Sequence, residues 1–89
     1  MGVTLTADEL QDSLAVSLAR AVAAANKRAR ALGIDVLRSV VTITQRALDG
    51  SVVWRINYGP RECVGRRGGD LVIDVDPDTA TVKQVLKGQ

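Results

Sequence analysis

The sequence predicts an α+β fold, in which one long N-terminal helix packs on a four-stranded antiparallel sheet, with three strands as the smaller alternative. Two hydrophobic patterns carry this prediction. Apolar residues recur at helical spacing over residues 7–32, and strand-like alternation then continues to the C-terminus. Because the strands all follow the helix, we expect them to pair with one another on one side of it.

The size and composition predict a single domain, residues 1–89, with a thin core. Hydrophobic residues make up 46% of the chain and charged residues 25%, which is ordinary globular usage and excludes intrinsic disorder. Trp54 and Tyr58 are the only aromatic residues, so Leu, Val, Ile and Ala must build the core. Small domains with thin cores often gain stability by pairing, and we therefore expect a homodimer.

The charge and the missing residue types disfavour several classes of function. A net charge of +2 is too mild to imply nucleic acid by itself, and the chain has no His for proton transfer or metal ligation. We therefore expect no enzymatic activity and no cofactor. Cys63 is the only cysteine, so no internal disulfide can form. The sequence has no leader pattern and no apolar run of about 18 residues, which predicts a cytoplasmic protein away from membranes.

The helix is predicted from both of its ends and from its apolar stripe. Thr6 and Glu9 have the spacing of a capping box, which places the first helical residue near Ala7. Gly33 is the expected left-handed residue after the last turn, and Ile34 can fold back as an apolar contact. The stripe expected to face the sheet consists of Leu10, Leu14, Leu18, Ala21, Ala25, Ala29 and Leu32.

The first two strands are predicted to form a tight hairpin. Residues 40–46 are rich in β-branched side chains, and Asp49-Gly50 suits the positive φ angles of a type I′ turn. In the second strand, alternate residues should face the helix, namely Val52, Trp54, Ile56 and Tyr58. The opposite face should carry Val53, Arg55 and Asn57.

The remaining strands follow a long loop. Residues 59–69 contain four glycines and a proline and are expected to be irregular. The third strand, residues 70–76, should point Leu71, Ile73 and Val75 inward and Val72, Asp74 and Asp76 outward. After a turn at residues 77–79, the last strand, residues 80–87, should place Val82 and Leu86 on one side and Lys83, Val85 and Lys87 on the other.

The glycine-rich loop is the first candidate for binding chemistry. Arg61, Arg66 and Arg67 lie among glycines that expose backbone amides, so the guanidinium groups could converge on a carboxylate or phosphate. The alternative is that these arginines are solvated charges on a loop. A single Gly-Arg-Arg-Gly-Gly string also resembles fragments of Arg-Gly repeats in nucleic-acid binders, but one copy within a folded domain is weak support for that function.

Three other candidates are weaker. Asp74, Asp76 and Asp78 alternate like the opening of a calcium loop, but Thr79 and Val85 stand where that loop needs Gly and Glu. We therefore expect these acids to keep an exposed strand and turn soluble. The arginines near Cys63 would favour its thiolate, yet no histidine exists to act as its base. Trp54 and Tyr58 are expected in the core; an outward-facing one would instead be a partner anchor.

Residues 50–89 resemble small bacterial cystatin-like domains, with the nearest pattern in PepSY-like domains and small NTF2-fold immunity-type proteins. Those families have a tryptophan strand, a Gly-Gly pair and a strand that runs into a V-x-D-x-x-T-G-x-V turn. Here the features are Trp54, Gly68-Gly69 and Val75 to Val82, with Ala80 at the glycine of the turn, and the chain ends Gly88-Gln89. The resemblance implies a non-enzymatic domain that binds another protein, in an inhibitor- or immunity-like role. The Gln-x-Val-x-Gly hairpin of cystatin inhibitors is missing, so we do not predict inhibition of cysteine proteases.

Two functions remain open from sequence. The leading hypothesis is a protein-interaction module, which binds another protein or a second copy of itself through a sheet edge or the open sheet face. Its predicted contact residues are Arg55, Asn57, Arg61, Arg66, Arg67 and Val72. The alternative is a weak nucleic-acid or anion binder that uses the arginines of the loop with the basic end of the helix at Lys27, Arg28 and Arg30.

Overall fold

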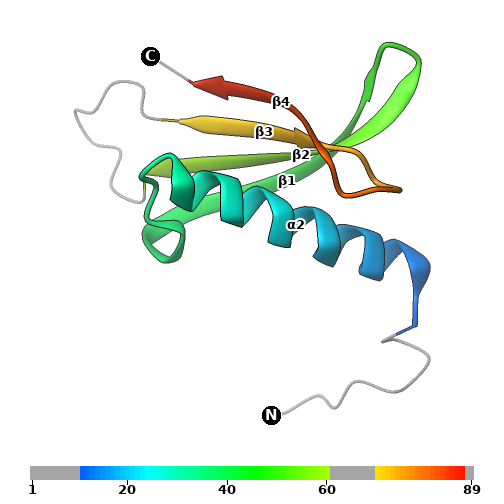
Figure 1. Cartoon of the computed structure of the whole chain (residues 1–89), viewed down its shortest axis with the longest axis horizontal. Coiled ribbons are helices and arrows are strands. Elements are labelled where there is room, and N and C mark those ends of the chain that lie inside the picture. Colours follow the sequence, from blue (N-terminus) through cyan, green and yellow to red (C-terminus); the bar gives the residue numbers. More distant parts are fainter. Residues whose placement is uncertain (1–10, 61–69, 88–89) are drawn as a thin grey trace.

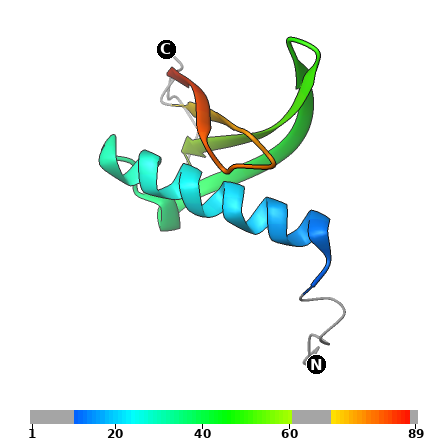
Figure 2. The same ribbon diagram turned by 45° about the vertical axis from the view of Figure 1, so that its right-hand side comes forward.

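The computed structural model describes residues 11–60 and 70–87, apart from the side chain of Leu48 (Figure 1). One helix packs on one face of a four-stranded antiparallel sheet whose strands lie in sequence order, β1-β2-β3-β4. The helix packs against β2 and β3 (Figures 1 and 2). This confirms the predicted α+β arrangement. The elements are α2 (Ser13–Ala31), the 3-10 turn η1 (Val36–Arg38), β1 (Ser39–Leu48), β2 (Ser51–Pro60), β3 (Leu71–Val75) and β4 (Val82–Lys87).

The start of α2 corrects the prediction of one continuous helix over residues 7–32. Asp12 is extended, with φ −61° and ψ 122°, and its carboxylate accepts a hydrogen bond from the Ala15 N–H at 2.9 Å. A short acidic side chain at this position satisfies a first-turn N–H that has no carbonyl partner. Asp12 is therefore the N-cap of α2. The predicted cap at Thr6 lies outside the described residues.

The end of the helix is as predicted. Gly33 has a φ of 89°, and the Ile34 N–H donates back to the Ala29 carbonyl at 2.9 Å. This six-residue closure is the Schellman motif, which uses a left-handed glycine to satisfy the last carbonyls of a helix. Ile34 then packs against the core.

The core lies between α2 and the two central strands, and small residues bring the helix close to the sheet. Leu10, the first residue of the predicted stripe, lies outside the described residues. Leu14, the next, is 59% exposed, and Leu32, at the other end, is also exposed. The 19 residues of α2 span about 29 Å, whereas the five residues of β3 span about 17 Å, so the helix overhangs the strand. The buried core consists of Ala21, Ala25, Ala29, Trp54, Ile56, Tyr58, Leu71, Ile73 and Val75.

The hairpin between β1 and β2 has the predicted turn, but β2 extends further than predicted. Asp49 and Gly50 have φ angles of 51° and 81°, as a type I′ turn requires. Gly59 and Pro60 were expected in the irregular loop, yet they pair with Val40 and Ser39 of β1. Proline is tolerated there because β3 begins opposite Tyr58, so no described strand lies beside Pro60 on that side.

The last strand places some of its side chains on the opposite face of the sheet from the one predicted. Val82 pairs with Val75 and Gln84 pairs with Asp74, so Lys83 is an extra residue in a β-bulge. The bulge shifts the alternation of the strand by one residue. As a result Val82 and Val85 both pack on the core, whereas Leu86 is exposed on the other face.

The turn between β3 and β4 is built around Asp76. The N–H groups of Thr79 and Asp78 donate to its Oδ1 at 3.0 and 2.8 Å, and these bonds, with the nearby Lys83, lower the pKa of the Asp76 carboxyl. Ala80 follows with a φ of 58°, and its N–H donates to the Asp76 carbonyl at 2.9 Å. Ala80 thus adopts the left-handed conformation that glycine adopts without strain.

We predict that Ala80→Gly stabilises the protein. The left-handed conformation costs a residue with a Cβ about 1–2 kcal/mol, and the greater chain entropy of glycine offsets part of that, for a net gain of roughly 0.5–1 kcal/mol. Urea unfolding followed by Trp54 fluorescence measures the gain. Ala23→Gly, on the exposed face of α2, is the matched control and should lose about 1 kcal/mol. A loss of stability in Ala80→Gly would contradict the strained conformation.

We also predict that acid weakens the fold through Asp76. Its folded pKa lies below the ordinary value of 3.8, so its contribution to stability is fully present above that pH and is lost as the pH falls through the folded pKa. Asp76→Asn keeps the acceptor oxygen and removes the titration. Urea unfolding from about pH 5 to about pH 2 should therefore show a smaller loss in the variant than in the wild type. Equal losses in the two proteins would exclude this role for Asp76.

Candidate interaction surface

Three of the contact residues predicted from sequence lie on the sheet face opposite α2. Asn57 and Val72 are direct cross-strand neighbours and are both half-buried. Arg55 lies two residues before Asn57 on the same face of β2. The structure therefore brings these three residues together. The other three predicted contacts, Arg61, Arg66 and Arg67, lie outside the described residues.

The Arg55 side chain is already held within the protein. Its Nε and Nη2 donate to the two carboxylate oxygens of Asp74, each at 2.8 Å, and this hydrogen bonding raises the pKa of Arg55. Asp74 is fully buried, and the Arg55 side chain is 21% exposed. The prediction of Asp74 as an exposed solubilising acid is therefore wrong. The Arg55 guanidinium covers the Asp74 carboxylate, so the Nε and Nη2 donors of Arg55 are not free to bind a partner.

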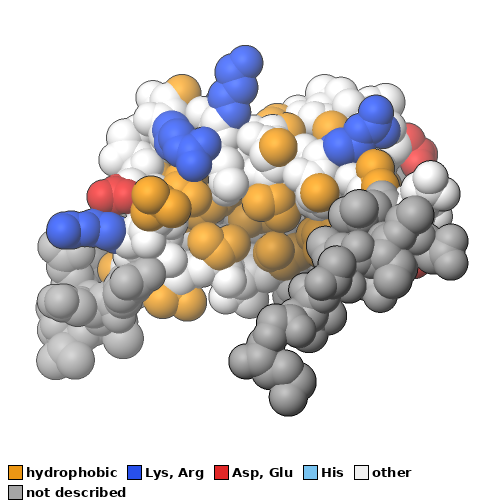
Figure 3. Space-filling model, turned by 90° about the horizontal axis from the view of Figure 1, so that it is seen from below, with side chains coloured by type: hydrophobic (Ala, Val, Ile, Leu, Met, Phe, Trp, Pro, Cys, Tyr) orange, Lys and Arg blue, Asp and Glu red, His pale blue; other side chains and the backbone are white. Residues whose placement is uncertain are grey.

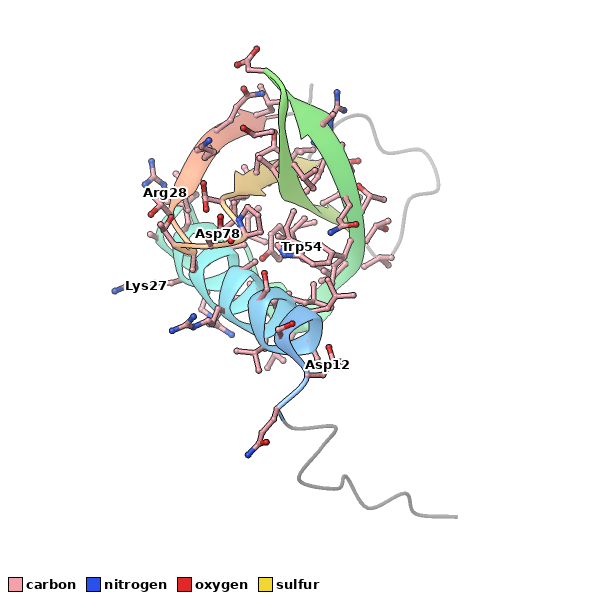
Figure 4. All side chains as sticks on the ribbon, turned by 90° about the vertical axis from the view of Figure 1, so that its right-hand side faces the viewer. Asp12, Lys27, Arg28, Trp54 and Asp78 are labelled. Carbon is pink, nitrogen blue, oxygen red and sulfur yellow. The ribbon has the colours of Figure 1, made fainter. Side chains whose placement is uncertain are left out.

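The two aromatic residues lie under the helix, as expected. The Trp54 indole N–H donates to Ser17 Oγ at 3.0 Å, and the Ser17 hydroxyl donates to the Pro77 carbonyl at 2.8 Å. The Tyr58 hydroxyl donates to Asn26 Oδ1 at 2.6 Å, and burial raises the pKa of Tyr58 to about 12. Figure 4 shows Trp54 between α2 and the sheet. Neither aromatic residue is an exposed partner anchor.

The outer edge of β1 is the most open part of the described sheet. β1 pairs only with β2 among the described strands, and residues 40–47 are all exposed. Val41 and Ile43 pair with Tyr58 and Ile56, so they point to the face of the sheet that carries the helix. They are nevertheless 37% and 38% exposed, because α2 lies over β2 and β3.

Half-buried apolar side chains of the helix add to this surface. Tyr58 contacts Asn26, so the flank of α2 that carries Asn26 and Val22 faces β1, while Ser17 on the other flank faces the β3–β4 turn. Figure 3 shows hydrophobic side chains gathered in a band across this side of the molecule. We define the apolar strip as Leu18, Val22, Val41 and Ile43.

The two edges of the sheet differ in chemistry. β4 carries Lys83, Lys87 and the β-bulge, and these features discourage the pairing of an edge strand with another chain. The ten residues of β1 contain no proline and no lysine, and Arg46 is their only charge. The β1 edge is therefore the one that can accept a further strand.

The basic end of α2 presents its charges on two sides of the helix. Lys27, Arg28 and Arg30 are exposed; Lys27 and Arg30 are three residues apart and share one side, whereas Arg28 lies about 100° from Lys27. Lys27 and Arg28 point away from the body of the protein (Figure 4). In residues 11–60 and 70–87, no group of three or more His, Cys, Asp or Glu side chains could hold a metal ion. The described part of the chain also has no helix that is long and apolar enough to span a membrane.

Comparisons of the chain with protein-family models, with curated proteins and with solved structures found no match. The functional interpretation of the β1 edge and the apolar strip therefore depends on their geometry and chemistry.

We predict that Arg55→Ala destabilises the fold by roughly 3 kcal/mol, because it leaves the buried Asp74 carboxylate without its charge partner. Urea unfolding measures the loss. The double variant Arg55→Met with Asp74→Leu removes both charges and should recover most of the stability. A loss below about 1 kcal/mol in Arg55→Ala would show that the pair behaves like an exposed surface pair.

Proposed function

We propose that this protein is a non-enzymatic protein-interaction module that binds an extended segment along the open edge of β1. The observation that carries the proposal is the β1 edge beside the apolar strip, where residues 40–47 are exposed and no other described strand pairs. An inhibitor- or immunity-like role, implied by the cystatin-like resemblance, is the most specific form of the proposal. The proposed location is the cytoplasm.

Backbone geometry supports strand addition at this edge. Asp49 and Gly50 form a two-residue turn, so Leu48 and Ser51 are a hydrogen-bonded pair and the pattern alternates from there along β1. Alternate residues therefore direct their N–H and C=O groups away from β2. These residues are Ser39, Val41, Ile43, Gln45 and Ala47.

The apolar strip supplies selectivity for the added segment. In strand addition, main-chain hydrogen bonds provide affinity and contacts to alternate side chains provide specificity. Val41 and Ile43 point to the helix side of the sheet, and Leu18 and Val22 are half-buried apolar residues of α2 on that same side. A partner strand with apolar residues at alternate positions would fit this surface.

The sheet face opposite α2 is a second predicted contact surface. Asn57 and Val72 remain predicted contacts there, next to the Arg55–Asp74 pair. Their half-buried side chains offer less free surface than Val41 and Ile43. The β1 edge is therefore the first surface to test, and Val72→Lys tests the second.

We predict that Ile43→Lys abolishes capture of a partner by the tagged protein from its native extract after nuclease treatment. A lysine at this position blocks strand addition, and Ile43 is exposed enough for the fold to accept it. Val52→Lys is the matched control, since it makes the same change at an exposed residue near the hairpin turn. Isothermal titration of the purified partner against the wild type, Ile43→Lys and Val52→Lys then measures the affinity of each.

Three results would contradict this proposal. They are a wild type that stays monomeric and captures no protein, equal loss of binding in Ile43→Lys and Val52→Lys, and loss limited to Val72→Lys. A signal that nuclease removes and that weakens steeply with salt would instead support the nucleic-acid alternative.

A further inference from the structure

We propose that the segment bound at the β1 edge is β1 of a second copy, paired antiparallel about a two-fold axis that passes through Ile43. This inference rests on the proposed function and names its partner. The result is a continuous eight-stranded sheet with both helices on the same face. Four observations support the pairing.

The first observation is the direction of the free backbone groups. A strand related to itself by a two-fold axis runs antiparallel to its copy, so the contact is the same on both sides. Only residues with free N–H and C=O groups can form the hydrogen-bonded pairs. An axis through Ile43 pairs Ile43 with itself and Val41 with Gln45 of the partner subunit. It also places Ser39 opposite Ala47 of the partner subunit, where only the Ser39 carbonyl is available, because the Ser39 N–H donates to the Val36 carbonyl.

The second observation is charge. With the axis at Ile43, Arg46 lies opposite Val40 of the partner subunit, so no like charges meet. With the axis moved one residue to Thr42, Arg46 would lie opposite Arg38 of the partner subunit, which is unfavourable. The Ile43 axis also places Thr42 opposite Thr44 of the partner subunit, and cross-strand threonine pairs are stabilising.

The third observation is the apolar strip. The two-fold axis is perpendicular to the sheet, so the helix-side faces of the two β1 strands lie next to each other. Ile43 then contacts Ile43 of the partner subunit, and an axis at Thr44 would replace this contact with the weaker pairing of Ile43 and Gln45. The Ile43 axis therefore reduces the exposure of Ile43, which lies near the middle of β1.

The fourth observation is that such an assembly closes. Pairing consumes both β1 edges, and the eight-stranded sheet then ends at two β4 strands. Each β4 carries Lys83, Lys87 and a β-bulge, which oppose further strand addition. A second copy thus covers the open edge without starting an extended fibre. A strand from an unrelated partner would not by itself leave two β4 strands as the edges of the combined sheet.

The first test measures the mass of the wild-type protein in solution. Its result does not depend on whether a variant folds. Sedimentation velocity should give about 19 kDa, twice the chain mass of 9.5 kDa. Ile43→Lys should sediment as a monomer with unchanged circular dichroism, and Val52→Lys should remain a dimer. A monomeric wild type, or a dimer that Ile43→Lys does not dissociate, would overturn the proposal.

Cysteine cross-linking tests the position of the axis. In a Cys63→Ser background, Ile43→Cys should form an intermolecular disulfide rapidly on mild oxidation, because the two thiols face each other across the axis. Thr42→Cys should cross-link much more slowly, since its own copy is displaced by two residues, at about 7–8 Å. Faster cross-linking at residue 42 would overturn the axis at Ile43.

The outcomes also separate this inference from the proposed function. A monomer that still captures a different protein, with capture lost in Ile43→Lys, would overturn the second copy as partner and leave the interaction module standing. A monomer that captures nothing would overturn both.

Discussion

The close approach of α2 to the central strands is the constraint on which the rest of the structure depends. Ala21, Ala25 and Ala29 are fully buried, and none of them has a side chain beyond Cβ that would hold the helix away from the sheet. The helix therefore packs closely on β2 and β3, where Tyr58, Ile56 and Leu71 are the largest fully buried side chains. Among the described residues, none covers the helix-side face of β1 as α2 covers that of β2 and β3.

Polar contacts fix where the helix lies along the sheet. Ser17 accepts from the Trp54 indole and donates to the Pro77 carbonyl, so one hydroxyl joins α2 to β2 and to the β3–β4 turn. Two and a half turns later along the helix, Asn26 accepts a hydrogen bond from the Tyr58 hydroxyl, which joins α2 to β2 a second time. A buried indole N–H or phenol O–H without a partner costs about 1–3 kcal/mol, so sliding the helix would be unfavourable even where the apolar packing tolerates it.

Much of this fold could be predicted because it depends on local alternation and on turn chemistry. Asp49-Gly50 specifies its own turn, Gly33 ends the helix, and the inward residues of β2 and β3 follow from period two. The β-bulge could not be predicted, because it arises from how Val82 and Gln84 pair with β3. No local sequence pattern marks Lys83 as the extra residue. The burial of Asp74 likewise depends on a match with Arg55, 19 residues earlier, that no local pattern contains.

The open edge of β1 could be predicted only in part from the sequence. Strand order decides which strands lie at the edges of the sheet, and without that order any of the four strands could be an edge strand. The useful signal was the contrast between residues 40–46, which are β-branched and nearly uncharged, and the last strand with its two lysines. The sequence instead favours the basic loop as a binding site, because clustered arginines form a local pattern and an unpaired strand edge does not.

Simple dimensions explain why such an edge exists in this fold. A helix is about 10 Å across and neighbouring strands are about 4.8 Å apart, so one helix covers roughly two strands of a four-stranded sheet. Which outer strand stays uncovered depends on the lateral position of the helix. The Ser17 contact with Pro77 holds α2 toward the β3–β4 side, where Ala80, Val82 and Val85 pack against the core. Within residues 11–60 and 70–87, the strand that α2 leaves uncovered is therefore β1, and its exposure follows from the position of the helix.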